Sequence, residues 1–162
     1  MMLRDAVEAD LPGILAIYNH AVLNSTAIWN DTPTDLANRL AWLRDRRDKS
    51  YPVIVAEENG EVLGYASFGD FRPFDGFRIS VEHSVYVAEA ARGRGIGRRL
   101  VESLFGPARA IGKKVMIGGI TGGNAASLAL HAALGFVETG HMPGIGIKFG
   151  QRLDLVLVQK EL

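Results

Sequence analysis

The feature that most constrains this chain is a run of glycines and arginines, ARGRGIGRRL at residues 91–100. Before it, RISVEHSVYVAE has the β-branched and aromatic pattern of a strand. After it, the apolar residues Leu100, Val101, Leu104 and Phe105 follow helical spacing. A strand that turns through glycines directly into a helix brings free backbone N–H groups to the helix N-terminus. This order favours an α/β fold with an anion site at the turn.

Two other glycine-rich phosphate motifs do not fit the run. A GxGxxG dinucleotide fingerprint starting at Gly93 or Gly95 needs a glycine three positions after its second glycine, where the chain has Arg98 or Leu100. The run also follows several strands, whereas that fingerprint opens the first βαβ unit. No GxxxxGK[ST] pattern is present anywhere. Arginines around a glycine turn suit a polyphosphate, which carries several negative charges.

The overall charge narrows the possible partners. The 162 residues contain 18 Lys+Arg and 18 Asp+Glu, so no field over the whole chain attracts nucleic acid or an anionic membrane. A nucleic-acid-binding domain usually has a wide basic face with interleaved aromatic residues. Here the basic residues near the run end at Lys113 and Lys114. We therefore expect no nucleic-acid partner, although such a contact, or a plain solvated helix start, is the alternative reading of the arginines.

The chain contains no cysteine, which excludes disulfides, thiolate metal sites and a cysteine nucleophile. The N-terminus is charged from Arg4 onward and lacks the apolar centre of a signal peptide. No apolar run approaches the ~18 residues needed to cross a bilayer. His20 and His141 form no metal-ligand spacing with the other histidines. We expect one cytoplasmic domain over residues 1–162, with no metal and no membrane partner.

The remaining patterns alternate between strands and helices, in the order β-α-α-β-β-β-α-β-α-β-β. This order predicts a mixed sheet with helices on both faces. Asn59-Gly60 is a strong hairpin signal, Asp10 is a candidate helix cap, and Gly106-Pro107 predicts a kink or a break in the helix after the arginines. Strands are expected at 2–6, 51–71 (a hairpin), 78–89, 113–121, 136–143 and 152–162, and helices at 8–23, 34–47, 96–105 and 123–136.

Several segments of the chain resemble one known family. The R-x-x-G-x-G spacing of Arg92, Gly95 and Gly97, after a strand and before a helix, resembles the acetyl-CoA pyrophosphate signature of the GCN5-related N-acetyltransferase (GNAT) superfamily. Five segments in order resemble its phosphinothricin and methionine sulfoximine acetyltransferase branch: AVEADLPGILAIYNHAV, GYASFGDFRPFDGFR, VEHSVYV, NAASLALHAALGF and KFGQRLDL. The resemblance implies a central, mostly antiparallel mixed sheet with splayed strands, and an acetyl-CoA-dependent enzyme.

The resemblance also implies how acetyl-CoA is held. The pantetheine arm would pair with the free strand edge at Val85, Tyr86 and Val87. Asn124, which the pattern itself marks as a helix cap, and Ser127, one turn later, would lie near the cofactor. The pyrophosphate would be bound by Arg92, Gly93, Arg94, Gly95, Ile96, Gly97 and Arg98.

Glu82 is the candidate catalytic base. A carboxylate within an apolar and hydroxylic strand is costly unless it has a task or a partner, and burial would raise its pKa toward the range of a general base. The resemblance places Glu82 at the acceptor amine, as a base or as an ionic anchor; an exposed strand position is the alternative. His131 is implied as the acid that protonates the thiolate, although a packed histidine explains it equally well. His83 would point to the opposite face from Glu82, as a core or surface histidine.

The acceptor is expected to be the α-amine of a small amino acid. Arg72 suits a carboxylate clamp, and the resemblance adds Pro73, Phe74 and Trp29 to the substrate pocket, with a contact across a homodimer interface. Glu82 would also contact the substrate. The chain departs from the branch at Phe71, at Thr121-Gly122-Gly123 and at Phe149-Gly150-Gln151-Arg152.

These residues predict an N-acetyltransferase for methionine sulfoximine, methionine sulfone or phosphinothricin, with a role in detoxification. Without a cysteine to carry the acetyl group, transfer would be direct. A peptide or protein N-terminal acetyltransferase is the alternative within the fold, and a non-catalytic acyl-CoA sensor is the alternative from another class.

Overall fold

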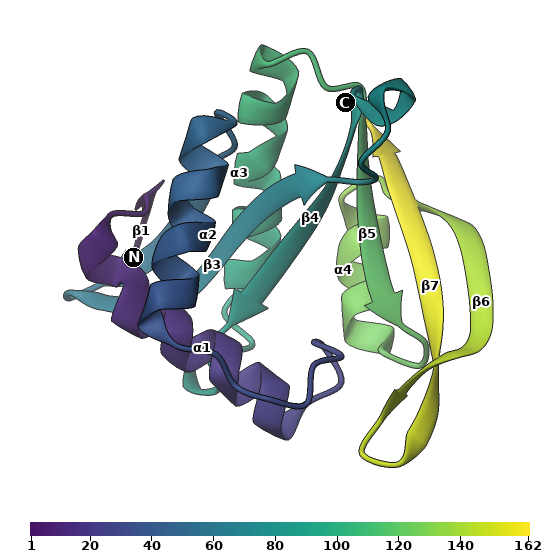
Figure 1. Ribbon diagram of the computed structural model, residues 1–162, viewed down its shortest axis with the longest axis horizontal. Helices are drawn as coiled ribbons and strands as arrows, with labels where there is room; N and C mark the ends of the chain where they lie inside the picture. Colours follow the sequence, from purple (N-terminus) through teal and green to yellow (C-terminus); the bar gives the residue numbers. More distant parts are fainter.

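The computed structural model describes residues 1–162 and contains one seven-stranded sheet in the order β1-β2-β3-β4-β5-β7-β6 (Figure 1). Only β4 and β5 pair in parallel; every other neighbouring pair is antiparallel. The element order predicted from the sequence and the mixed sheet are both confirmed. The strands are β1 (Met2–Asp5), β2 (Val53–Glu58), β3 (Glu61–Asp70), β4 (Ser80–Val87), β5 (Val115–Thr121), β6 (Val137–Lys148) and β7 (Gln151–Glu161), and the helices are α1 (Leu11–Asn24), α2 (Leu36–Asp48), α3 (Ile96–Ala110) and α4 (Ala125–Ala133).

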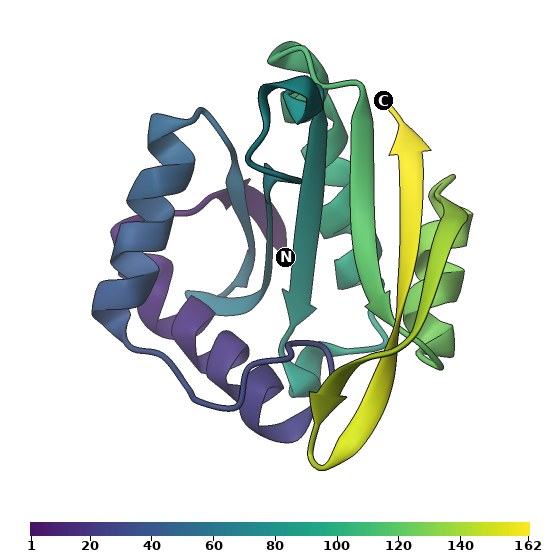
Figure 2. The ribbon, with the colours of Figure 1, turned by 45° about the vertical axis from the view of Figure 1, so that its right-hand side comes forward.

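The period-two alternation of the strands assigns each helix pair to one face of the sheet. In β2, Val53 and Val55 pack in one cluster with residues of α1 and α2, whereas Ile54 and Ala56 pack in the other with residues of α3. Figures 1 and 2 show the same division, with α1 and α2 on one side of the sheet and α3 and α4 on the other. The predicted helices on both faces are therefore confirmed.

Strands β4 and β5 separate after a short stretch of pairing, and this opens the sheet. Their register comprises only Ser80 with Val115, Val81 with Met116 and Glu82 with Ile117. Beyond that point β5 continues along β7 as far as Thr121, while β4 continues along β3 as far as Val87. The edge of β4 that faces β5 is thus unpaired after Glu82, and Figure 2 shows the two strands diverging. Unpaired strand edges offer backbone donors and acceptors to a ligand.

Helix α3 corrects one sequence-based expectation, because no break occurs at Gly106-Pro107 and the helix continues to Ala110. A proline inside a helix costs about 3 kcal/mol. Leu100, Val101 and Leu104 are completely buried on the same helix, and each contributes about 1.5–3 kcal/mol. Burial of the apolar face therefore outweighs the missing hydrogen bond.

Asp10 does not cap α1 with its side chain as expected. Its carboxylate faces backward, accepting two hydrogen bonds from the Arg4 guanidinium at 2.7 and 2.8 Å and one from the Val7 N–H at 2.8 Å. Arg4 is the main cause that lowers the pKa of Asp10. The carboxylate thus connects β1 to the start of α1. Helix patterning alone does not reveal that Arg4 is its partner.

Candidate active site

Two adjoining cavities lie along the unpaired edge of β4. The larger has a volume of about 980 Å³ and the smaller about 470 Å³. Ala27, Val85, Tyr86 and Asn124 line both, so the cavities meet at this edge. Two of the three strand residues expected to hold the pantetheine arm therefore lie where the cavities join, and Val87 lines the larger one.

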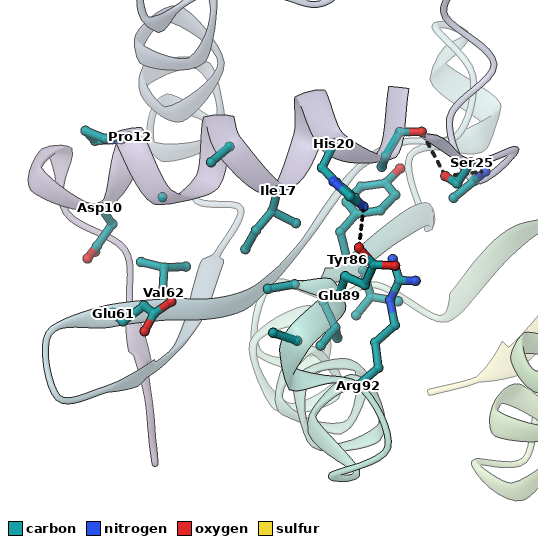
Figure 3. A pocket seen from close by; sticks show the side chains of 18 of the residues that line it. Asp10, Pro12, Ile17, His20, Ser25, Glu61, Val62, Tyr86, Glu89 and Arg92 are labelled. Atoms are coloured by element: carbon teal, nitrogen blue, oxygen red, sulfur yellow. Dashed lines mark hydrogen bonds and ion pairs between the residues drawn. The ribbon is translucent and has the colours of Figure 1, made fainter. Parts of the chain in front are cut away.

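The larger cavity runs between α1 and the turn after β4, as Figure 3 shows. Ile17 and His20 reach it from α1, and Glu89 and Arg92 reach it from the turn. His20 Nε2 lies 3.3 Å from a carboxylate oxygen of Glu89, and this contact connects the two walls. A long, mixed apolar and polar groove of this kind suits an extended ligand such as acetyl-CoA.

Residues 92–98, the cradle, have the backbone expected of an anion site. Gly93 and Gly95 have φ of +79° and +74°, the left-handed region that glycine adopts without strain. Gly95 is the N-cap of α3 and no side chain caps the helix, so the first N–H groups of α3 have no side-chain partner. A Cβ at either glycine would meet nothing within 4 Å. The space in front of the cradle is open, and the geometry fits a pyrophosphate.

The cradle arginines are not equivalent. Arg94 forms an ion pair with Glu58 at 2.9 Å, and Arg98 lies 3.5 Å from Glu102. Arg92 has no carboxylate partner and lines the larger cavity. Arg92 is therefore the cradle arginine whose charge is available to a ligand inside that cavity.

The side chain of Glu82 lines the smaller cavity and makes no hydrogen bond or ion pair with the rest of the chain. One of its carboxylate oxygens lies 3.6 Å from the position that a Cβ at Gly119 would take, so the side chain extends across the gap toward β5. Burial raises the pKa of Glu82, and the positive charge of Arg72 partly opposes this rise. A carboxylate with a raised pKa and no protein partner can accept a proton from a ligand.

His131 is buried in contact with His83, a pairing that the sequence did not indicate. Their Nε2 atoms lie 2.9 Å apart, and His131 Nδ1 lies 2.7 Å from the carbonyl oxygen of Ser127. Because a carbonyl only accepts, His131 Nδ1 carries the proton, and a neutral ring then accepts at Nε2 from His83. Burial lowers the pKa of both rings, that of His83 to about 4. His83 does project to the opposite face from Glu82, as expected, and it is a core residue.

Asn124 performs the capping role that its position predicts. Its side-chain oxygen accepts a hydrogen bond of 3.1 Å from the Ser127 N–H, which closes the first turn of α4. Asn124 and Ser127 both line the smaller cavity, as does His131 one turn further along the helix. The three residues expected on one line of this helix are thus brought to the same wall.

Trp29 lines the smaller cavity as expected, on a loop between α1 and α2 that several long-range contacts hold in place. Its indole N–H is 3.0 Å from Thr121 Oγ1 on β5. The loop is also fixed by Lys148, a fully buried residue whose ammonium donates to the Ile28 carbonyl at 2.5 Å. At Gly146 a Cβ would lie 2.2 Å from the Trp29 ring, so only glycine fits beneath the indole. Sequence patterning did not identify either Lys148 or Gly146 as part of this wall.

Arg72, Pro73 and Phe74 are not brought to either cavity wall within one chain. They lie in the exposed loop between β3 and β4, where the Phe74 side chain is 68% exposed. Arg72 stacks on the Phe71 ring at 5.2 Å and acts on Glu82 through its charge. Arg46, on α2, does line the smaller cavity and was not predicted.

The structure contains no group of three or more His, Asp or Glu side chains that could hold a metal ion. None of its helices combines the length and the apolar character that a membrane crossing requires.

Comparison with known proteins agrees with this geometry. Residues 14–136 match the acetyltransferase (GNAT) family. The chain is 58% identical over 161 residues to the L-methionine sulfoximine/L-methionine sulfone acetyltransferase of Pseudomonas aeruginosa, covering 99% of this chain and 94% of that protein. It superposes on the ribosomal-protein-alanine N-acetyltransferase from Brucella melitensis with a TM-score of 0.98 and 56% identity, over 100% of both chains. A phosphinothricin acetyltransferase from Sinorhizobium meliloti, solved in complex with acetyl-CoA, has a TM-score of 0.96 and 41% identity, over 99% of this chain and 88% of that one.

The family, the mixed α/β fold and acetyl-CoA as the co-substrate, all predicted from the sequence, are confirmed by these similarities. The cradle, the free edge of β4 and the adjoining cavities supply the features that such a co-substrate requires. The chain belongs to the acetyltransferase (GNAT) family and is an N-acetyltransferase.

Proposed function

We propose that this enzyme transfers the acetyl group of acetyl-CoA to the α-amine of a small amino-acid-like acceptor, with L-methionine sulfoximine, L-methionine sulfone and phosphinothricin as candidates. The observation that carries the proposal is the position of Glu82, an unpaired carboxylate with a raised pKa in a cavity of about 470 Å³. That volume lies within the range of small-molecule pockets. The names of the similar proteins from Pseudomonas aeruginosa and Sinorhizobium meliloti support this acceptor class.

The proposed roles of the chain in holding acetyl-CoA follow from its backbone. The free edge of β4 would pair with the amides of the pantetheine arm, and Asn124 and Ser127 would contact the arm from α4. Acetyl-CoA supplies an acetyl group that is activated as a thioester. The pyrophosphate would be held by Arg92, Gly93, Arg94, Gly95, Ile96, Gly97 and Arg98.

In the proposed chemistry, Glu82 accepts a proton from the acceptor ammonium, directly or through one water. The free amine then attacks the thioester carbonyl, so that a C–N bond forms, the C–S bond breaks, and the thiolate departs. The nitrogen releases its second proton to water in this step, which balances the proton that the thiolate gains. The chain has no cysteine to carry the acetyl group, which favours this direct transfer. Backbone N–H groups at the free edge of β4 are available to stabilise the oxyanion.

His131 is proposed to protonate the departing thiolate. Its Nδ1 proton is held by the Ser127 carbonyl, and its Nε2 accepts from His83. His131 can therefore donate from Nε2 only when the imidazole pair has gained a proton. The lowered pKa of His131 means that such a proton is readily released.

Removing the charge of Arg72 is expected to change the pH profile. Arg72 lowers the pKa of Glu82, so Arg72→Gln raises that pKa further. Because the base must be ionised, the acidic limb of kcat/KM moves to higher pH. The pH dependence of kcat/KM at fixed ionic strength measures the shift, and Arg78→Gln, in the same loop, is the control. An acidic limb that stays in place or moves to lower pH would contradict the charge coupling.

Two other functions fit parts of the structure. A peptide or protein N-terminal acetyltransferase is suggested by the name of the similar structure from Brucella melitensis. A non-catalytic acyl-CoA sensor needs the cradle but has no use for an unpaired carboxylate such as Glu82. The small cavity, closed on one side by Trp29, favours a free amino acid over both.

The test measures thiol release from acetyl-CoA with a panel of free amino acids, amino-acid analogues and peptides. The proposal expects turnover with L-methionine sulfone, L-methionine sulfoximine or phosphinothricin, and little turnover with peptides of matching N-terminal residue. Turnover with peptides alone would identify the N-terminal acetyltransferase. Acetyl-CoA binding with no turnover of any acceptor would identify the sensor.

The enzyme is further proposed to be a homodimer of single-domain chains. The larger cavity draws on α1 and α4, and the smaller on the loop after α1, on α2 and on α4, so one chain supplies the walls of both. Ile145, Ile147 and Phe149 are 53%, 65% and 60% exposed at the β6 edge of the sheet, where exposed apolar residues favour association. A second copy would also cover Phe74. The loop between β3 and β4 of one chain would then lie near the acceptor bound in the other chain. Light scattering coupled to gel filtration should give the mass of two chains.

Acetylation converts the acceptor ammonium into a neutral amide. A compound that acts by resembling a free amino acid would then no longer be recognised through that charge. We therefore propose detoxification in the cytoplasm, where acetyl-CoA is available, as the role of the reaction.

A further inference from the structure

A free amino acid carries two opposite charges that lie close together, and a cavity that binds it must accommodate both. At neutral pH its ammonium nitrogen and carboxylate oxygens lie within about 4 Å of each other, because only two bonds separate the nitrogen from the carboxylate carbon. Glu82 supplies the anion that an ammonium requires. A pocket that selects zwitterions also needs a cation at a matching distance, since an unpaired buried carboxylate costs more than the pocket gains.

Arg46 is the only lysine or arginine among the residues that line the smaller cavity. It projects from α2 onto the sheet, where its guanidinium lies against Gly69: a Cβ at Gly69 would be 2.8 Å from Nη2 and 3.1 Å from Cζ. Because Gly69 has no side chain, the Arg46 guanidinium can pack directly against the backbone of β3. In the register of β3 and β4, Gly69 pairs directly with Glu82.

This register places the two charges on the same face of adjacent strands. The Cα atoms of directly paired antiparallel residues lie about 4.5–5.5 Å apart, and their side chains project to the same side. The Glu82 carboxylate turns away from β3 toward Gly119 of β5, whereas Arg46 sits over β3. Both charged groups therefore reach the smaller cavity, Glu82 from the β5 side and Arg46 from above β3.

Arg46 is also incompletely neutralised. Its one ion pair within hydrogen-bond distance is with the neighbouring Asp45, at 3.2 Å from Nη1, and that carboxylate is half exposed. The Nε atom is buried without any partner. A guanidinium that is largely removed from water with so little compensation has capacity for a further anion.

We propose that Arg46 binds the α-carboxylate of the acceptor while Glu82 takes its ammonium, so that the pair selects zwitterionic amino acids. The inference rests on the proposed function, whose acceptor class it sharpens. Arg72 then acts from the exposed loop through its charge, and Arg46 makes the direct contact inside the cavity. The neutral carboxamide of the same amino acid can accept a hydrogen bond from Arg46 but lacks the charge attraction and the bidentate pairing of a carboxylate.

The experiment compares free L-methionine sulfone with its carboxamide as acceptors, in the wild-type enzyme and in Arg46→Gln, Arg46→Lys and Arg72→Gln. For Arg46→Gln, the ratio of kcat/KM for the acid to that for the amide is expected to fall about 10- to 100-fold, the usual range for a hydrogen bond to a charged group. Arg46→Lys should retain part of the preference, because lysine keeps the charge without the planar fork. Thermal unfolding verifies that each variant is folded, and the acid-to-amide ratio separates carboxylate binding from a general loss of structure.

Calorimetric binding of L-methionine sulfone, in the presence of CoA, separates the inference from the proposed function. Binding that weakens in Arg46→Gln without turnover in the wild type would support the inference and overturn the function. Turnover in the wild type with an unchanged acid-to-amide ratio in Arg46→Gln would overturn the inference alone. A ratio that falls in Arg72→Gln and not in Arg46→Gln would overturn it in favour of Arg72, and absence of both binding and turnover would overturn both proposals.

Discussion

Replacing Glu82 with glutamine is expected to lower kcat about 10²- to 10⁴-fold, the usual contribution of a general base. Glutamine keeps the size and the hydrogen-bonding capacity of the side chain but cannot take a proton from the acceptor. Glu82 lines the smaller cavity, away from the cradle, so the dissociation constant for acetyl-CoA should change less than about threefold. Steady-state kinetics give kcat, and calorimetry gives the affinity for acetyl-CoA.

The pH dependence of the variant separates a base from an ionic anchor. In the wild type, burial raises the pKa of Glu82, so kcat/KM increases as the pH rises through a value above the ordinary range of a glutamate. In Glu82→Gln this acidic limb should disappear. The residual rate should instead increase toward high pH, as a larger share of the acceptor amine loses its proton in solution. Glu138→Gln, an exposed carboxylate on β6, is the control. A loss of less than tenfold in kcat would show that Glu82 is not the base.

The local parts of the site could be predicted because short stretches of sequence determine them. The turn from strand to helix at Gly93 and Gly95 follows from the glycine pattern, and the observed positive φ values agree with it. The cap at Asn124 and the hairpin at Asn59-Gly60 are similarly local. In each case the interacting groups are a few residues apart, so composition and spacing carry the information.

The parts that could not be predicted depend on contacts between distant segments. Strand alternation assigns His83 to the face opposite Glu82, but it does not indicate that His131, 48 positions later, lies against it. Lys148 donates to the carbonyl of Ile28, 120 positions earlier. In the sequence, Lys148 looks like an ordinary exposed lysine in a strand. Arg46 lies on a helix with several arginines, and only the register of Gly69 with Glu82 distinguishes it from the others.

Replacing Gly95 with valine is expected to raise the KM for acetyl-CoA about 10- to 100-fold. Gly95 has φ of +74° at the first turn of α3, and an L-residue in this region costs about 1–2 kcal/mol, most for a β-branched side chain. The chain can relieve that strain only by turning the peptide units of the cradle, which moves the N–H groups away from the pyrophosphate. Each charge-assisted hydrogen bond lost there costs a further 1.5–3 kcal/mol or so.

The acyl donor shows whether the loss comes from the cradle itself. S-acetylpantetheine carries the same thioester without the pyrophosphate, so Gly95→Val should reduce the preference for acetyl-CoA over this donor. Gly106→Val is the matched control, since Gly106 lies in the same helix without a positive φ and a Cβ there would meet nothing within 4 Å. Equal losses with both donors would mean that the substitution distorts α3 as a whole. An unchanged KM for acetyl-CoA would show that the cradle does not bind the pyrophosphate. The free edge of β4 would then be the main binding site for the co-substrate.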